Sequence, residues 1–154
     1  MGDWSNVKNA FGFKPVARLA LNDDGCLQWH PESDIIEVEE TPSTYVMVLN
    51  PGLDDELETV LYVGMAGKGW AVRAKQHNGG LKRTHNGTET KTIWLEHFAK
   101  RKAWLQENRQ IMVFERASQT YEVFGQQVSL QHAEEQALIK MLNPSQNRAG
   151  VSKV

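Results

Sequence analysis

Two apolar stretches decide the fold of this chain: TYVMVL at residues 44–49 and TVLYVG at residues 59–64. Both are rich in β-branched and aromatic residues, which favour extended strands. They are separated by Asn50-Pro51-Gly52 and an acidic loop, a combination that favours a chain reversal. The sequence therefore predicts a β-hairpin near the middle of the chain.

Helical and extended segments alternate after this hairpin. A helix is predicted over residues 69–77, followed by a glycine-rich polar segment to Thr90. A second helix is predicted over residues 92–106, where apolar side chains recur at helical spacing. Residues 110–116 alternate like a strand, and residues 121–124 are predicted to form a further short strand after a turn.

The last predicted helix begins at Ser129, because serine is favoured at helix N-caps. It continues to Leu142, with its apolar residues on one face. The dipeptide Asn143-Pro144 ends it, because proline disfavours helical backbone at the preceding residue.

The N-terminal forty residues are expected to be β-rich. Residues 16–21 and 35–38 are predicted to be short strands on either side of a turn at residues 22–25, which are Asn, Asp, Asp and Gly. The whole order predicts an α+β fold, with a small antiparallel three-stranded sheet flanked by helices. We expect one compact domain, made of an N-terminal β-rich extension over residues 1–40 and a main domain over residues 41–150.

The 154 residues are enough to bury a core without disulfides or structural metals. The single cysteine, Cys26, is interpreted as a small buried side chain, and the histidines at 30, 85, 97 and 132 show no ligand spacing. No apolar run approaches the roughly 18 residues needed to span a bilayer, and the N-terminus does not resemble a signal peptide. We therefore expect a cytoplasmic protein with no membrane partner.

Charge is unevenly distributed along the chain, although the net charge is only −2. Residues 1–67 carry three Lys and Arg against twelve Asp and Glu, residues 68–102 carry nine against two, and the remainder carries five of each. A basic block in an otherwise acidic chain is a candidate contact for the phosphate backbone of a nucleic acid. A solvated basic helix face is the alternative interpretation.

Four separated pieces of sequence carry the candidate functional residues. The first is Ser43-Thr44-Tyr45, and the second is Tyr62-Val63-Gly64 on the other strand of the hairpin. The third is the pair Arg73 and His77, one turn apart on a predicted helix. The fourth runs from Glu135 to Asn147 and includes a Leu-Ile pair and a proline.

This ordered set resembles the GIY-YIG nuclease superfamily over roughly residues 43–148, in the compact stand-alone form of restriction-like or phage-like endonucleases. The resemblance makes residues 41–150 a catalytic domain. The first motif keeps only its tyrosine. Met65 stands where many members have a lysine, and Lys68 is a candidate to reach the same phosphate.

The resemblance implies hydrolysis of phosphodiester bonds in DNA, with Glu135 as the ligand of Mg²⁺ or Mn²⁺. A single carboxylate, together with waters and the phosphate itself, suits magnesium, which keeps much of its hydration shell. The ion would act as a Lewis acid toward the phosphate. The adjacent Glu134 is interpreted as a surface carboxylate.

The resemblance also assigns roles to the other motif residues. Tyr45 would take the proton from the attacking water, assisted by Arg73 and His77, because an unperturbed tyrosine with a pKa of about 10 is a poor base at neutral pH. Tyr62 would hydrogen-bond a phosphate oxygen or the water. Asn147 would orient the substrate or brace the site.

Basic side chains between the motifs are candidates for contacts with the DNA backbone. They are Lys68, Lys75, Lys82, Arg83, Lys91, Lys100, Arg101 and Lys102. Two alternatives stay open: a nucleic-acid binding module of the same fold with weakened catalysis, and a nuclease that acts on RNA or branched DNA. One active site per chain makes a homodimer an expectation for cutting both strands.

Overall fold

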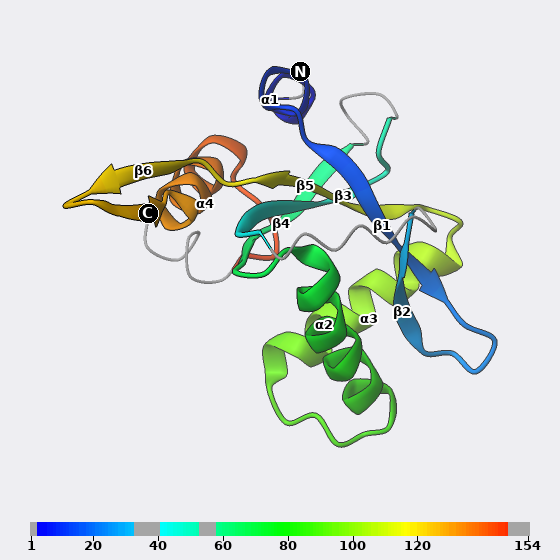
Figure 1. Cartoon of the computed structure of the whole chain (residues 1–154). Coiled ribbons are helices and arrows are strands. Elements are labelled where there is room, and N and C mark those ends of the chain that lie inside the picture. The colour runs from blue at the N-terminus through cyan, green and yellow to red at the C-terminus, as the bar shows by residue number, and fades with distance from the viewer. Residues whose placement is uncertain (1–2, 33–40, 53–57, 148–154) are drawn as a thin grey trace.

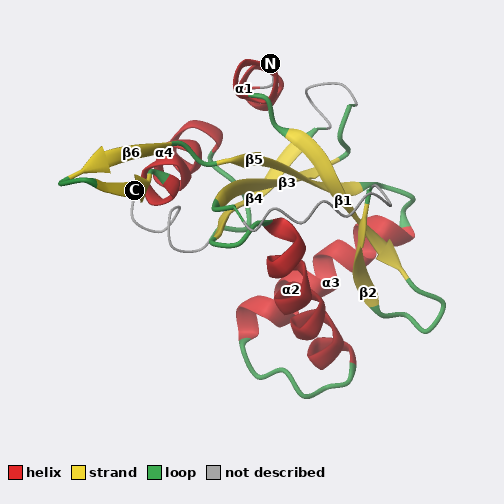
Figure 2. Ribbon diagram, in the orientation of Figure 1, coloured by secondary structure: helices red, strands yellow, loops and turns green. Residues whose placement is uncertain are grey.

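The structure is a computed structural model that describes residues 3–32, 41–52 and 58–147. Four helices and seven strands occupy these residues (Figures 1 and 2). In chain order they are α1 (Asp3–Phe11), β1 (Lys14–Leu21), β2 (Leu27–Pro31), β3 (Ser43–Leu49), β4 (Thr59–Ala66), α2 (Trp70–His85), α3 (Thr92–Gln106), β5 (Ile111–Ala117), β6 (Thr120–Val123), β7 (Gln126–Ser129) and α4 (Gln131–Leu142). The strand predicted over residues 35–38 lies outside the described residues.

The α+β class and the antiparallel sheet are confirmed, but the main sheet has five strands in the order β2-β1-β5-β3-β4. The prediction of three strands was wrong because β1 pairs with β5, and β2 then pairs with β1. The N-terminal extension is therefore part of the main sheet. It also contains α1, which was not predicted, although its buried residues Trp4 and Val7 have helical spacing.

Strand β3 lies inside the sheet, between β5 and β4, and all seven of its residues are buried. Successive side chains of a strand point to opposite faces. Tyr45 and Met47 pack in one apolar cluster with residues of α2, while Val46 and Val48 pack in a second cluster with residues of α1 and α4. The sheet thus separates α2 and α3 on one face from α1 and α4 on the other (Figure 2).

Helix α2 runs to His85, eight residues beyond the predicted end at His77. The glycines that suggested an earlier end lie inside the helix. Gly80 is buried, and Trp94 of α3 lies beside it. Packing against α3 therefore outweighs the low helix propensity of glycine here.

Helix α4 is held against β4 by the segment that follows it. Asn143 ends the helix in the left-handed conformation, with φ 46°. Beyond it, the backbone N–H groups of Ser145 and Gln146 donate to carbonyls of β4 at 3.2 and 2.7 Å. The predicted N-cap, Ser129, was wrong: Ser129 ends β7, and the N-cap of α4 is Leu130, although the Ser129 hydroxyl does accept the N–H of Gln131 at 3.1 Å.

The predicted strand at residues 121–124 corresponds to β6, which pairs with β7 in a separate hairpin. Cys26 is buried and free, as predicted. Among the described residues, no helix combines the length and apolar character that crossing a membrane requires.

Candidate active site

A cleft of about 600 Å³ opens at the β4 edge of the sheet, where the α2–α3 layer meets α4. Its walls come from β3, β4, α2, α3, α4 and the segment after α4. All six predicted catalytic residues line it. They are Tyr45, Tyr62, Arg73, His77, Glu135 and Asn147.

Tyr45 is the most enclosed of these residues, with 2% of its surface exposed. Its ring contacts Trp70 edge-on, with the ring centroids 4.9 Å apart. Its hydroxyl lies 3.1 Å from Nε2 of His77, across a separation of 32 residues. The first motif and the helix that follows the second motif are thus joined by one hydrogen bond.

Gly64 is required in the second motif because the Tyr45 ring crosses its backbone. The two residues face each other in the β3–β4 pairing. A Cβ at position 64 would stand 2.4 Å from Cζ of Tyr45. An overlap this close requires a shift, and the atoms in the way are the phenol end of Tyr45, so we expect any side chain at this position to displace the phenol from His77.

We expect Gly64→Ala to destabilise the chain by about 1–3 kcal/mol through this overlap, and to separate the Tyr45 hydroxyl from His77. Gly67→Ala is the matched control, because a Cβ at Gly67 meets nothing within 4 Å. Urea unfolding measures both variants, and the control should change stability by less than about 0.5 kcal/mol. Equal stabilities for the two variants would contradict the assignment.

Burial controls ionisation at the Tyr45–His77 pair. Burial raises the pKa of the Tyr45 phenol well above its ordinary value, and Tyr62 adds to this, while Arg73 and Arg101 lower it by less. Burial also lowers the pKa of the His77 imidazole to about 3, assisted by Arg101 and Arg73. The expected help from Arg73 is therefore present but smaller than the effect of burial, and at neutral pH both groups are uncharged.

The depressed pKa of His77 predicts acid sensitivity. Above the unfolded pKa of about 6.5, His77 is neutral in both states and its contribution to stability is complete. As the pH falls from 6.5 toward 3, the unfolded chain binds a proton that the folded chain does not, so the free energy of unfolding decreases. His97, whose pKa burial lowers to about 4, acts in the same direction.

Urea unfolding between pH 7 and pH 4 tests this expectation. The wild type should lose a few kcal/mol of stability over this range, and His77→Gln should lose measurably less, because it removes one of the two histidines with a depressed pKa. Parallel pH profiles for the wild type and His77→Gln would contradict the assigned pKa.

Glu115 is a positioning residue that sequence reasoning did not single out. Its Oε2 accepts the backbone N–H of Trp70, at the start of α2, and the hydroxyl of Ser43. A carboxylate at a helix N-terminus is favoured by the exposed N–H groups and by the helix dipole. Glu115 thereby connects β5, β3 and the helix that carries Arg73 and His77.

Glu135 and Arg73 approach the cleft from opposite layers of the fold. Glu135 lies in α4 and is half-buried, and burial raises the pKa of its carboxyl above the ordinary value. Arg73 lies in α2 and donates to Oε1 of Gln76 at 2.7 Å. Glu134, beside Glu135 in sequence, instead accepts from Thr44 at 3.1 Å and lies 3.5 Å from Arg116. It is a structural carboxylate outside the cleft.

Asn147 braces the site through β4. Its Oδ1 accepts the N–H of Val63 at 2.7 Å, and its Nδ2 donates to the carbonyl of Val63 at 2.8 Å. The side chain thus imitates a neighbouring strand at the edge of the sheet. This geometry favours the bracing role over direct orientation of a substrate.

Helix α3 contributes cleft residues that sequence reasoning missed or placed elsewhere. Trp94, His97 and Arg101 all line the cleft. Their spacing of three and four residues puts them on one stripe of α3, which is a signal that was available in the sequence. Arg101 was expected at a DNA-facing surface but is only 2% exposed, and its Nε donates to Oε1 of Gln146 at 2.9 Å.

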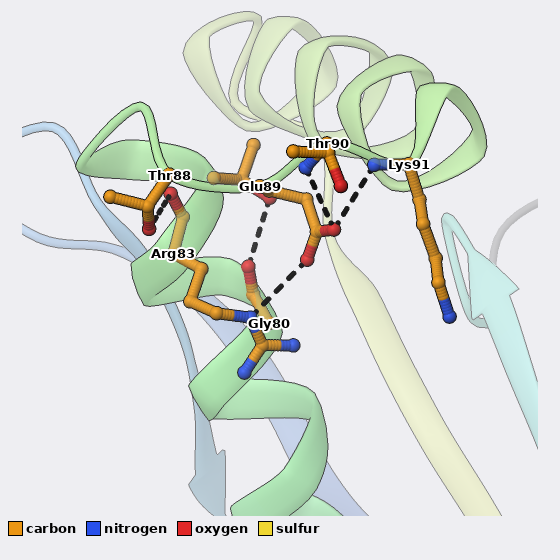
Figure 3. Close-up of polar contacts among 7 residues, drawn as sticks. Gly80, Arg83, Thr88, Glu89, Thr90 and Lys91 are labelled. Carbon is orange, nitrogen blue, oxygen red and sulfur yellow. Dashed lines mark hydrogen bonds and ion pairs between the residues drawn. The ribbon is translucent and has the colours of Figure 1, made fainter.

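The last turn of α2 and the connection to α3 present two further cations to the cleft, Arg83 and Lys91. Glu89 organises this connection (Figure 3). Its Oε1 accepts the backbone N–H groups of Thr90 and Lys91 at 3.0 and 3.1 Å, and its Oε2 lies 3.3 Å from Nε of Arg83. Thr88 also donates to the carbonyl of Arg83 at 3.2 Å, so the turn is held at several points.

The other predicted DNA contacts lie outside the cleft. Lys68, the candidate to replace the lysine missing at position 65, is exposed and does not line the cleft, whereas Met65 itself does. Lys82 lines a second, smaller cavity beside the β1–β2 turn. The side chains of three others are exposed or half-buried on α2 and α3: Lys75, Lys100 and Lys102.

The donor set of the cleft fits one hard divalent ion that shares its coordination with a substrate. Among the described residues that line the cleft, Glu135 is the one carboxylate, and the cations are Arg73, Arg83, Lys91 and Arg101. No group of three or more His, Cys, Asp or Glu side chains that could hold a metal occurs among residues 3–32, 41–52 and 58–147. One carboxylate with waters and phosphate oxygens is a coordination that magnesium accepts.

Comparisons with known proteins bear on the fold. No protein-family profile and no curated protein sequence matches the chain. Among solved structures, a mutant of bacteriophage T4 EndoII is similar, with a TM-score of 0.62 and 17% identity over 94% of this chain and 97% of that one. The restriction endonuclease HPY188I in complex with product DNA gives a TM-score of 0.44 and 16% identity over 100% of this chain and 87% of that one. The chain therefore shares the fold of bacteriophage T4 EndoII.

Proposed function

We propose that the chain is a metal-dependent DNA endonuclease of the GIY-YIG type. One observation carries this proposal: six residues predicted from four separated motifs meet in a single cleft that contains four cations and one carboxylate. A surplus of positive charge around one carboxylate suits a phosphodiester together with one divalent ion. The fold shared with bacteriophage T4 EndoII supports the proposal at the level of architecture.

Tyr45 and His77 act together on the attacking water. Because burial opposes a free phenolate, the Tyr45 hydroxyl takes a proton from water as it passes its own proton to Nε2 of His77, in the tautomer that carries its proton on Nδ1. The negative phosphodiester favours the cationic imidazole that results. The water oxygen forms a bond to phosphorus, one P–O ester bond breaks, and the leaving oxygen takes a proton from solvent.

Glu135 would hold Mg²⁺ or Mn²⁺ beside the phosphate. When bound, the ion supplies Lewis-acid stabilisation of the negative charge on phosphorus and on the leaving oxygen. Arg73, without a carboxylate partner among the described residues, binds a phosphate oxygen from the α2 side. Tyr62 provides a hydroxyl in the same cleft for the phosphate or the water.

The exposed cations of α2 and α3 extend the binding surface along the DNA backbone. They contact phosphates without reading sequence, so their contribution should weaken steeply as the salt concentration rises. Binding at several salt concentrations measures this. A homodimer would place two clefts on one duplex, and the mass in solution tests that state.

Substrate competition separates the endonuclease from its alternatives. Labelled duplex DNA, duplex RNA and a four-way DNA junction are incubated together with the protein and Mg²⁺ at fixed salt. The proposal predicts cutting of the DNA duplex at a rate above that of RNA. Salt-sensitive binding of all three without cutting would indicate a binding module, and faster cutting of the junction would indicate a branched substrate.

A further inference from the structure

Arg101 is the one buried cation in the described part of the chain, and its charge has no counterion there. Its side chain is 2% exposed, and its Nε donates to the neutral Oε1 of Gln146 at 2.9 Å. None of the ion pairs between described residues includes it. Burial lowers the pKa of the guanidinium only to about 10, so it stays charged at neutral pH.

The neighbouring side chain, Gln146, also has a buried hydrogen-bond donor without an acceptor. It is 6% exposed, and within the described ranges its Nε2 is buried without a hydrogen-bond partner. The opposite amide orientation would place that NH₂ group against the N–H of Arg101, so the donor must point away from the guanidinium. Two adjacent side chains therefore offer donors to the cleft: the Nη groups of Arg101, for which Nε alone has an acceptor among the described residues, and Nε2 of Gln146.

Such an arrangement is costly unless an anion completes it. Moving a guanidinium out of water costs desolvation free energy, and only a well-placed opposite charge offsets this cost. A buried N–H donor without an acceptor also destabilises the fold. Both residues line the cleft that contains Tyr45, Tyr62 and Glu135. The planar guanidinium matches two oxygens of a phosphate, and the amide can donate to a third acceptor position.

We propose that Arg101 and Gln146 form a phosphate-binding pair that holds non-bridging oxygens of the scissile phosphodiester and does so without metal. This inference rests on the proposed function for the identity of the phosphate. It gives α3 and the segment after α4 a direct part in substrate binding, in addition to Arg73 of α2. It also implies that the chain gives up stability to keep this cation unpaired.

The test measures binding of inorganic phosphate in buffer without divalent metal, by isothermal titration and by the phosphate-dependent rise in unfolding temperature. Arg101→Met should weaken phosphate affinity at least about tenfold and abolish the rise in unfolding temperature. In phosphate-free buffer the variant should unfold at a higher temperature than the wild type, because a desolvated charge has been removed. Lys140→Met, an exposed cation of α4 outside the cleft, should behave like the wild type.

Gln146→Glu provides a second variant of nearly identical shape. Its carboxylate would neutralise Arg101 from within, so phosphate affinity should fall at least about tenfold and the unfolding temperature in phosphate-free buffer should rise. A purely structural pair would instead leave phosphate affinity unchanged in both variants. That result, or a wild type that binds no phosphate, would overturn the inference.

Competition with DNA identifies the natural source of the phosphate. A short duplex should displace inorganic phosphate from the wild type, whereas simultaneous binding of both would overturn the assignment to the scissile phosphate. The two experiments distinguish failure of the nuclease proposal from failure of the phosphate-binding pair. Arg101-dependent phosphate binding without DNA cleavage would contradict only the nuclease, and DNA cleavage with unchanged phosphate binding in both variants would contradict only the pair.

Discussion

Glu135→Gln should abolish cleavage of duplex DNA, lowering the single-turnover rate at least about a thousandfold. The substitution keeps the size of the side chain and removes the one carboxylate found among the described residues of the cleft. A bound divalent ion contributes several kcal/mol of charge stabilisation to phosphoryl hydrolysis, and each 1.4 kcal/mol changes a rate tenfold. The amide of glutamine replaces neither the charge nor the affinity for a hard cation.

Two measurements accompany this rate. Binding of duplex DNA without metal should be unchanged or tighter, because a negative charge has been removed from a phosphate site. Glu96→Gln, an exposed carboxylate of α3 outside the cleft, should cut at the wild-type rate. Wild-type cutting by Glu135→Gln would remove Glu135 from the metal site, and loss of cutting in both variants would show that the effect is not local.

Tyr45→Phe should lower the cleavage rate by about 10²–10⁴-fold, the range expected for loss of a positioned acid–base group. The ring still packs over Gly64 and against Trp70, so the fold should survive. His77→Gln should also lower the rate, because it removes the group proposed to receive the phenol proton, whose Nε2 lies 3.1 Å from the Tyr45 hydroxyl. DNA binding should be retained in both.

The double variant distinguishes a relay from two independent contributions. Residues that act as a unit have strongly non-additive effects, so Tyr45→Phe combined with His77→Gln should cut about as slowly as Tyr45→Phe alone. Tyr121→Phe, an exposed tyrosine of β6, is the matched control and should be unaffected. Multiplicative losses would mean that Tyr45 and His77 do not share one proton path.

Much of the fold could be predicted because its signals are local. The β3–β4 hairpin, the bounds of α3 and the end of α4 at Asn143 follow from residue type, periodicity and a helix-terminating proline. The five-stranded sheet could not be predicted in the same way. It depends on pairing of β1 with β5, which are about ninety residues apart, and local pattern does not specify such partners.

The same distinction between local signals and long-range contacts applies to the candidate site. Its six motif residues were identified by their order, and they do meet in one cleft. The hydrogen bond between Tyr45 and His77 and the burial of Arg101 depend on how α2 and α3 pack. Charge counting therefore grouped the buried Arg101 with the neighbouring lysines. The role of Glu115 was hidden for the same reason, since its partners lie 45 and 72 residues away.

The central claim is that this cleft hydrolyses DNA with a divalent ion. A time course of supercoiled plasmid with excess wild-type protein tests it most directly, first with Mg²⁺, then with the metal chelated, and then with Mg²⁺ restored. The account predicts nicked circles and then linear DNA with Mg²⁺, no cutting after chelation, and recovery when the ion returns. Plasmid that binds the protein yet stays supercoiled with both Mg²⁺ and Mn²⁺ would contradict it.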